Sequence, residues 1–287
     1  MTSLRLHFLL LLLVSSLGSL GCGGGTESGD PQEPEPSVEQ ENQDQSPAEQ
    51  TAPAPNASGT APSGPDQGNG DNEVESGKPA TLSGKVTLAS GQSRDRALLD
   101  MSSKPEHAEH CLSASDKLDR KVLVGQNGGL ANVFVEVRNA GLPAFSWPNA
   151  EISDQVHCRF EPHVLVVPVG EPITFRNSDP FLHNVHFFCK KNPAANFGIP
   201  ADGKKEFTFT AEERVGVKCD VHPWMDSWIV ATKNAAHALT DKAGNYEIED
   251  LKSGVYEVRF WHEVHGLIKV KKFALQPGDN RLDKVLP

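Results

Sequence analysis

The chain has 287 residues, with 27 Lys and Arg against 38 Asp and Glu, which gives a formal net charge of −11. The acidic surplus lies in residues 23–77, which hold 12 Asp or Glu and no Lys or Arg, so residues 78–287 are balanced. The composition shows no excess of basic residues, and it therefore excludes nucleic-acid binding of the usual electrostatic kind.

Residues 1–21 predict a secretory signal peptide. Arg5 precedes a short apolar run, Leu9 to Val14, which is too short to span a bilayer. Leu20-Gly21-Cys22 resembles the junction of a bacterial lipoprotein, which implies lipidation of Cys22 as the mature N-terminus. The alternative is plain secretion with cleavage elsewhere. We expect an exported protein, periplasmic or at the cell surface, held to a membrane by this lipid.

Residues 22–78 are acidic and rich in Pro, Gly and Ser, and they carry few apolar side chains. Such a segment buries too little apolar surface to order itself. The sequence therefore predicts a disordered tether between the anchor and the folded part.

The remainder of the chain predicts strands and no convincing helix. Alternating apolar and polar residues predict strands at 81–88, 130–138 and 206–210. Residues 163–177 indicate two strands around the turn Gly170-Glu-Pro, and residues 238–260 indicate two more strands, with Gly-containing turns. Further strands lead into and out of the segment 218–225, and residues 90–128 are expected to be loop. The predicted fold class is all-β.

The segment 218–225 reads Lys-Cys-Asp-Val-His-Pro-Trp-Met and places Cys219, His222 and Met225 at intervals of three. His183 lies 36 residues before Cys219, far enough to be on another strand of a β-sandwich. Thiolate and thioether are soft ligands and imidazole suits copper; two His and one Cys with a weak axial Met form the electron-transfer copper site.

Both loops resemble those of the cupredoxins, and Cys219-x-x-His222-x-x-Met225 has the spacing of amicyanin. The resemblance implies a Greek-key β-sandwich, here over residues 141–234, with one type 1 copper bound by the four ligands. It also implies that Asn184 ties the ligand loops together. The edge of His222 would be exposed as an electron port, with an apolar docking patch around it formed by Pro180, Phe181, Pro223 and Trp224.

Other interpretations of the site stay open. Cys219 and Met225 also fit an ordinary apolar core without metal. Zinc accepts two imidazoles and a thiolate, but Met is a poor zinc ligand. No nucleophile with a base partner and no phosphate-binding loop is visible, so we expect a protein that is not an enzyme.

Residues 79–140 and 235–287 resemble the beginning and end of a carboxypeptidase regulatory-like domain. This resemblance implies a second, transthyretin-like β-sandwich into which the cupredoxin domain is inserted or beside which it packs. Three consecutive units are the alternative. The order of motifs also resembles periplasmic proteins labelled methylamine-utilisation-like.

In an oxidising compartment the remaining cysteines favour one disulfide, for which Cys111 and Cys158 are the preferred pair. His107, His110 and His157 lie beside this pair, and we interpret them as exposed neighbours, with a second metal site as the alternative. His186 is expected in the core or at the rim of the site. His262 and His265 are expected at the surface.

These features together predict an exported blue-copper protein that transfers single electrons between redox protein partners outside the cytoplasm. A copper storage or delivery module is one alternative. A surface interaction protein that uses the cupredoxin fold only as a scaffold is the other.

Overall fold

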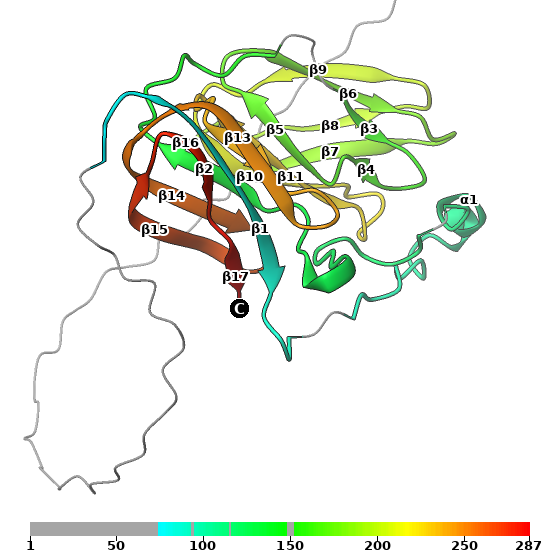
Figure 1. Cartoon of the computed structure of the whole chain (residues 1–287). Helices are drawn as coiled ribbons and strands as arrows, with labels where there is room; N and C mark the ends of the chain where they lie inside the picture. Colours follow the sequence, from blue (N-terminus) through cyan, green and yellow to red (C-terminus); the bar gives the residue numbers. More distant parts are fainter. Residues whose placement is uncertain (1–73, 93–94, 115, 148–151) are drawn as a thin grey trace, which may run out of the picture. The chain divides into compact units, whose positions relative to one another are not determined.

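The alternating segments of the sequence are strands in the computed structural model, which describes residues 74–92, 95–114, 116–147 and 152–287. The predicted all-β class is confirmed, because four sheets contain all the longer elements (Figure 1). The predictions for the signal peptide, for Cys22 and for most of the tether fall outside the described residues. Within those residues, which belong to one structural unit, no helix is long and apolar enough to cross a membrane.

Two of the sheets are built from the two ends of the described chain. One has the order β13-β1-β16, with β17 also paired to β1, and the other has the order β12-β2-β14-β15. The strands are β1 (Pro79–Leu88), β2 (Phe134–Arg138), β12 (His237–Leu239), β13 (Asn245–Lys252), β14 (Gly254–His262), β15 (Gly266–Leu275), β16 (Gly278–Arg281) and β17 (Lys284–Leu286).

The first strand shows why this part folds as it does. Alternate side chains of β1 are buried, and Leu82 and Val86 enter a core shared with β2, β13 and β14. β1 pairs antiparallel with β13 and parallel with β16 and β17. Strands from before and after the central segment therefore share both sheets. The division into two domains stays a prediction.

The central segment forms the other two sheets. One has the order β5-β11-β10-β7-β8 and the other β4-β3-β6-β9. The strands are β3 (Ile152–Gln155), β4 (Phe160–Glu161), β5 (Val164–Pro168), β6 (Pro172–Asn177), β7 (His183–Phe188), β8 (Asn196–Ile199), β9 (Lys204–Thr208), β10 (Glu213–Lys218) and β11 (Asp226–Thr232). Phenylalanines from both sheets, including Phe175, Phe187 and Phe209, fill the core between them.

Between β1 and β2 the described residues are mostly irregular, as predicted for residues 90–128, with three short helical turns among them. They are η1 (Pro105–His107), α1 (Ala108–Cys111) and η2 (Gln126–Gly128). A disulfide joins Cys111 to Cys158 just before β4, with the two Cα atoms 5.1 Å apart. This bond fastens the segment 105–111 to the central sheets and holds it at the candidate site.

Candidate metal centre

The sheet topology brings together three of the predicted ligands. His183 is the first residue of β7, Cys219 directly follows β10, and His222 lies in the loop between β10 and β11. Because β10 is antiparallel to both β7 and β11, the end of β10 lies beside the start of β7. Ligand loops far apart in sequence therefore meet at one end of the sheet.

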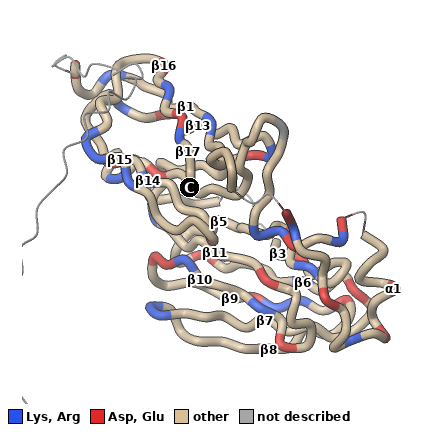
Figure 2. Tube along the Cα trace, turned by 90° about the horizontal axis from the view of Figure 1, so that it is seen from below, with Lys and Arg blue, Asp and Glu red and all other residues tan. Residues whose placement is uncertain are grey.

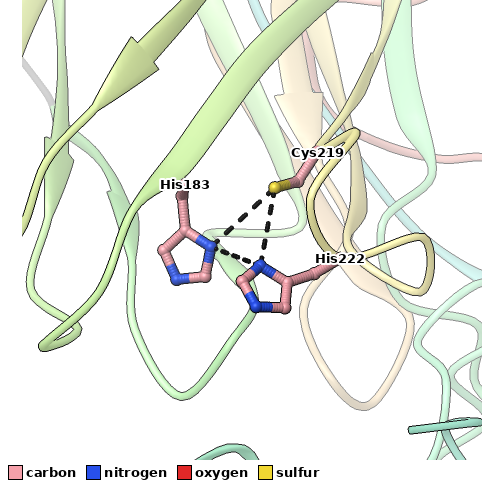
Figure 3. A group of neighbouring side chains, drawn as sticks. All are labelled: His183, Cys219 and His222. Atoms are coloured by element: carbon pink, nitrogen blue, oxygen red, sulfur yellow. Dashed lines mark hydrogen bonds between the residues drawn. The ribbon is translucent and has the colours of Figure 1, made fainter. Parts of the chain in front are cut away.

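The three donor atoms form a compact triangle (Figure 3). Nδ1 of His183 lies 2.8 Å from Nδ1 of His222, and Sγ of Cys219 lies 3.8 Å and 3.7 Å from these two nitrogens. A circle through the three atoms has a radius of about 2.0 Å, close to the bonds of about 2.0–2.3 Å that imidazole and thiolate make to zinc, an ion of similar size. The donor set fits a single metal ion.

The donors are closed off from solvent. His183 and His222 are fully buried, Cys219 is 2% exposed and Met225 is 1% exposed. The loop is tightly folded, because the backbone N–H of Cys219 donates to the carbonyl of Met225, and that of Met225 donates to His222. Met225 shares the core with Cys219, and its role as fourth ligand stays a prediction.

Asn184 links the two ligand loops. Its side-chain oxygen accepts the backbone N–H of Asp220 at 2.6 Å, and its amide nitrogen donates to the Asp220 carboxylate at 3.0 Å. Its own backbone N–H points at the sulfur of Cys219, 3.5 Å away. These bonds hold the thiol in place and supply a donor that would stabilise a thiolate. His186, at the rim, donates from Nδ1 to the same aspartate at 3.0 Å.

A carboxylate that the sequence interpretation missed orients His183. Asp179 is 1% exposed, and its oxygens lie 2.8 Å from Nε2 of His183 and 2.7 Å from Nε2 of His110. The backbone N–H groups of His157 and Cys158 also donate to it, each at 2.7 Å. Burial alone would raise the pKa of Asp179, but hydrogen bonds, first from His183 and then from His110, lower it to about 2.

The ionised Asp179 determines which nitrogen of His183 carries the proton. An acceptor at Nε2 keeps the proton there, so a neutral His183 turns the Nδ1 lone pair toward Cys219. Asp179, Cys158 and His183 also form a compact group, but the Cys158 sulfur belongs to the disulfide and offers no thiolate. The triangle of His183, Cys219 and His222 is therefore the candidate metal centre.

The two imidazoles differ in their titration. Burial opposes the protonation of His183, but hydrogen bonds to Asp179 and Cys219 outweigh it and raise the pKa of His183. Burial, followed by the nearby charges of His183 and His107, lowers the pKa of His222 to about 3. His222 is thus neutral at physiological pH, which is the state that a metal ligand needs.

The expectation that the edge of His222 is exposed is wrong. Nδ1 of His107 lies 2.8 Å from Nε2 of His222 and covers it. The His107 ring also stacks on Phe181, with centroids 3.8 Å apart and planes 4° from parallel. The Cys111–Cys158 disulfide and the His110–Asp179 hydrogen bond fix this segment over the site.

His107 and His110 are accordingly not exposed neighbours of the disulfide, because both are partly buried against the candidate centre. The sequence did mark them as a cluster beside Cys111, but gave no sign of their partners. Of the predicted docking patch, Pro180 and Pro223 are exposed, whereas Phe181 and Trp224 are partly buried and contact His222.

His262 and His265 are not surface residues either. His262 is 1% exposed and His265 is partly buried, and their rings lie 4.9 Å apart. The prediction failed because the central sheets cover this end of β14: Glu263 accepts from the indole N–H of Trp228 and lies beside His163.

Comparison with known proteins gives only distant likenesses. No protein-family model and no curated protein matches the chain. Similar solved structures include a copper-containing nitrite reductase from Thermus scotoductus, at 23% identity and a TM-score of 0.28 over 32% of this chain and 26% of that one. A purple cupredoxin from Nitrosopumilus maritimus is similar at 23% identity and a TM-score of 0.23, over 25% of this chain and 81% of that one.

A reduced mutant form of amicyanin is similar at 23% identity, with a TM-score of 0.27 over 34% of this chain and 97% of that protein. The chain thus spans about a quarter of the nitrite reductase and nearly all of amicyanin. Because these scores are low, what the centre binds has to be argued from the residues of this chain.

Proposed function

We propose that the chain binds one copper ion through His183, Cys219 and His222, with Met225 as a weak fourth ligand, and that it carries single electrons. The observation that carries the proposal is the buried triangle of one sulfur and two Nδ1 atoms with a radius that suits a metal ion. One soft thiolate with two imidazoles and a nearby thioether is a donor set that favours copper.

Copper in such a site would supply a one-electron couple between two charge states. The protein's own contribution is rigidity. Asp179 fixes the orientation of His183, Asn184 fixes the loop of Cys219, and His107 holds His222 from outside. Ligands held in this way need to move little when the metal charge changes, and burial keeps water out of the centre.

We further propose that electrons enter and leave through His107 rather than directly through His222. The ring of His107 is the outer member of a hydrogen-bonded pair of imidazoles and lies flat on Phe181. Pro180 and Pro223, which are exposed, would contribute to a small apolar contact with a redox protein partner. Such a contact suits the small interfaces of transient redox complexes.

A carrier function is favoured over storage or delivery of copper, because metal exchange needs a ligand that solvent can reach and the three donors are buried. It is favoured over catalysis because four ligands would leave no position for substrate. A role as an interaction scaffold predicts partner binding that does not depend on copper.

Export, lipid attachment at Cys22 and tethering by residues 22–78 are part of the proposal. Their support is the sequence of residues 1–78, and the disulfide between Cys111 and Cys158 is consistent with an oxidising compartment.

The test is a copper titration of the protein and of a Cys219→Ser variant. The wild type should bind one equivalent, develop an intense visible band, and lose and regain that band through cycles of reduction and oxidation. The serine variant should fold but stay pale, because the band requires the thiolate. A wild type that prefers zinc, or a variant that keeps the band, would refute the assignment.

A further inference from the structure

A second site lies away from the candidate metal centre, where the two pairs of sheets meet. A groove of about 650 Å³ is lined by residues of β10 and β11 on one side and of β2 and β14 on the other. Figure 2 labels β10, β11 and β14. Two of its lining residues, Phe134 and Val230, belong to a small core that also contains Val164 and Trp261 and is contributed by both pairs of sheets. The volume is within the range of pockets that hold small organic ligands.

The groove carries positive charge, although residues 78–287 as a whole are balanced. Six basic and three acidic side chains line it. Two of the acids are already occupied: Glu213 accepts the backbone N–H groups of residues 190–192, and Glu212 accepts the N–H of Lys233. Among the described residues, the lining lysines Lys190, Lys191 and Lys218 have no carboxylate within ion-pair distance.

Three arginines converge on the third acid, Glu136, whose side chain is 5% exposed. Arg214 and Arg259 share its Oε1 at 3.5 Å and 3.7 Å, and Arg138 faces its Oε2 at 3.3 Å. Each guanidinium carries five N–H donors, far more in total than one carboxylate can accept. Arg259 also pairs with Glu257. The three arginines still outnumber the two carboxylates, Glu136 and Glu257, so this cluster keeps a surplus of positive charge.

Arg214, on β10, is incompletely hydrogen-bonded. Nε of Arg214 is buried and has no hydrogen-bond partner. Its guanidinium lies over the ring of Trp261, 5.4 Å from the centroid, which leaves the charge without a second acceptor on that side. Burial and the charges of Arg259 and Arg138 lower the pKa of Arg214 despite its contact with Glu136. The cluster of three arginines and two glutamates therefore carries one net positive charge, which one further anion would neutralise.

We propose that this groove is a binding site for a small organic oxyanion, a carboxylate or a phosphate ester. Its charged head would lie among Arg138, Arg214 and Arg259, which offer bidentate donors. Its apolar body would lie along Trp228 and Phe188, which line the same groove. The site contains no residue of the candidate metal centre, so it goes beyond the proposed electron transfer and is independent of it.

The test is isothermal titration calorimetry with two probes, sulfate for the bare head and phenyl phosphate for head and body, at fixed ionic strength. The protein should bind one phenyl phosphate, more tightly than sulfate. Arg214→Gln should weaken binding about tenfold or more, because it removes a charged donor. Lys252→Gln, an exposed lysine at the end of β13 that does not line the groove, is the matched control and should bind as wild type.

A second variant keeps the test decisive if Arg214→Gln fails to fold. Glu136→Gln removes the carboxylate that competes for the arginines, so it should bind sulfate more tightly than wild type and gain more thermal stability from it. Binding without saturation, or equal affinities in wild type, Arg214→Gln and Glu136→Gln, would overturn the proposal. None of these readouts requires a bound metal.

Discussion

Replacement of Asp179 by Asn tests the hydrogen bonds that hold His183 in place, and this test does not require a bound metal. The carboxylate accepts from His183, His110 and two backbone N–H groups inside the protein. An amide of the same shape offers one acceptor oxygen and turns N–H donors toward other donors. The variant keeps the volume but loses the charge and at least one of these bonds.

The size of the effect follows from the pKa of Asp179. It falls from an ordinary 3.8 to about 2, and at 1.36 kcal/mol per pH unit this corresponds to about 2 kcal/mol of stability. Because the folded-state pKa is the lower one, the contribution is complete above pH 4 and is lost as the pH falls toward 2. The copper-free variant should therefore be less stable by about 2 kcal/mol at neutral pH.

The assay is urea unfolding of the copper-free protein between pH 7 and pH 2, followed by copper titration at pH 7. The variant should bind copper about 10- to 100-fold more weakly, since partners that orient ligand histidines have effects of this size. Asp154→Asn is the control, because Asp154 forms a surface pair with Arg176 and should cost less than about 1 kcal/mol. Wild-type stability and affinity in Asp179→Asn would refute the role given to Asp179.

Three further outcomes follow from the structure. His107→Ala should keep the visible band but release copper to a chelator about tenfold faster, because His222 loses a hydrogen bond and its cover. A rate of copper release equal to that of the wild type would show that His107 does not protect His222. Met225→Leu should retain copper and raise its reduction potential, as measured by voltammetry, because a donor to the oxidised metal is lost; a lower potential would count against an axial Met. Burial, and then the charges of His265 and His163, lower the pKa of His262 to about 4 from 6.5, so about 3 kcal/mol of stability should disappear between pH 6.5 and 4. His262→Gln should lack this slope in urea unfolding, and a slope that persists would show that His262 is not its source.

Much of the candidate centre could be predicted because its signal is local. Cys219 and His222 lie on one short loop, and His183 lies 36 residues earlier, far enough to be on another strand of a β-sandwich. The strand pattern of residues 81–88 likewise predicted β1, because alternate burial leaves a period of two in any sheet with one covered face.

The outer parts of the centre could not be predicted, because they depend on contacts between distant segments. His107 meets His222 across 115 residues, and His110 meets Asp179 across 69. The segment that carries these histidines is polar and has no period, so only the tertiary fold and the Cys111–Cys158 disulfide bring it to the site. Asp179 lay four residues before His183, within the first ligand loop, but many loops contain an aspartate.

The burial of His262 could not be predicted for a different reason. The Gly-containing turns predicted the strand that became β14, but they do not reveal which neighbouring sheet covers the end of that strand. The groove between the two pairs of sheets was hidden for the same reason, since Arg214 and Glu136 are 78 residues apart.

The most direct test of the central claim is the visible absorption and electron paramagnetic resonance spectrum of the protein with one equivalent of Cu(II). If two imidazoles and the Cys219 thiolate bind the ion, the spectrum should show an intense blue band and a narrow copper hyperfine splitting. A pale solution with a wide splitting, or no binding, would contradict a thiolate-bound copper at this centre.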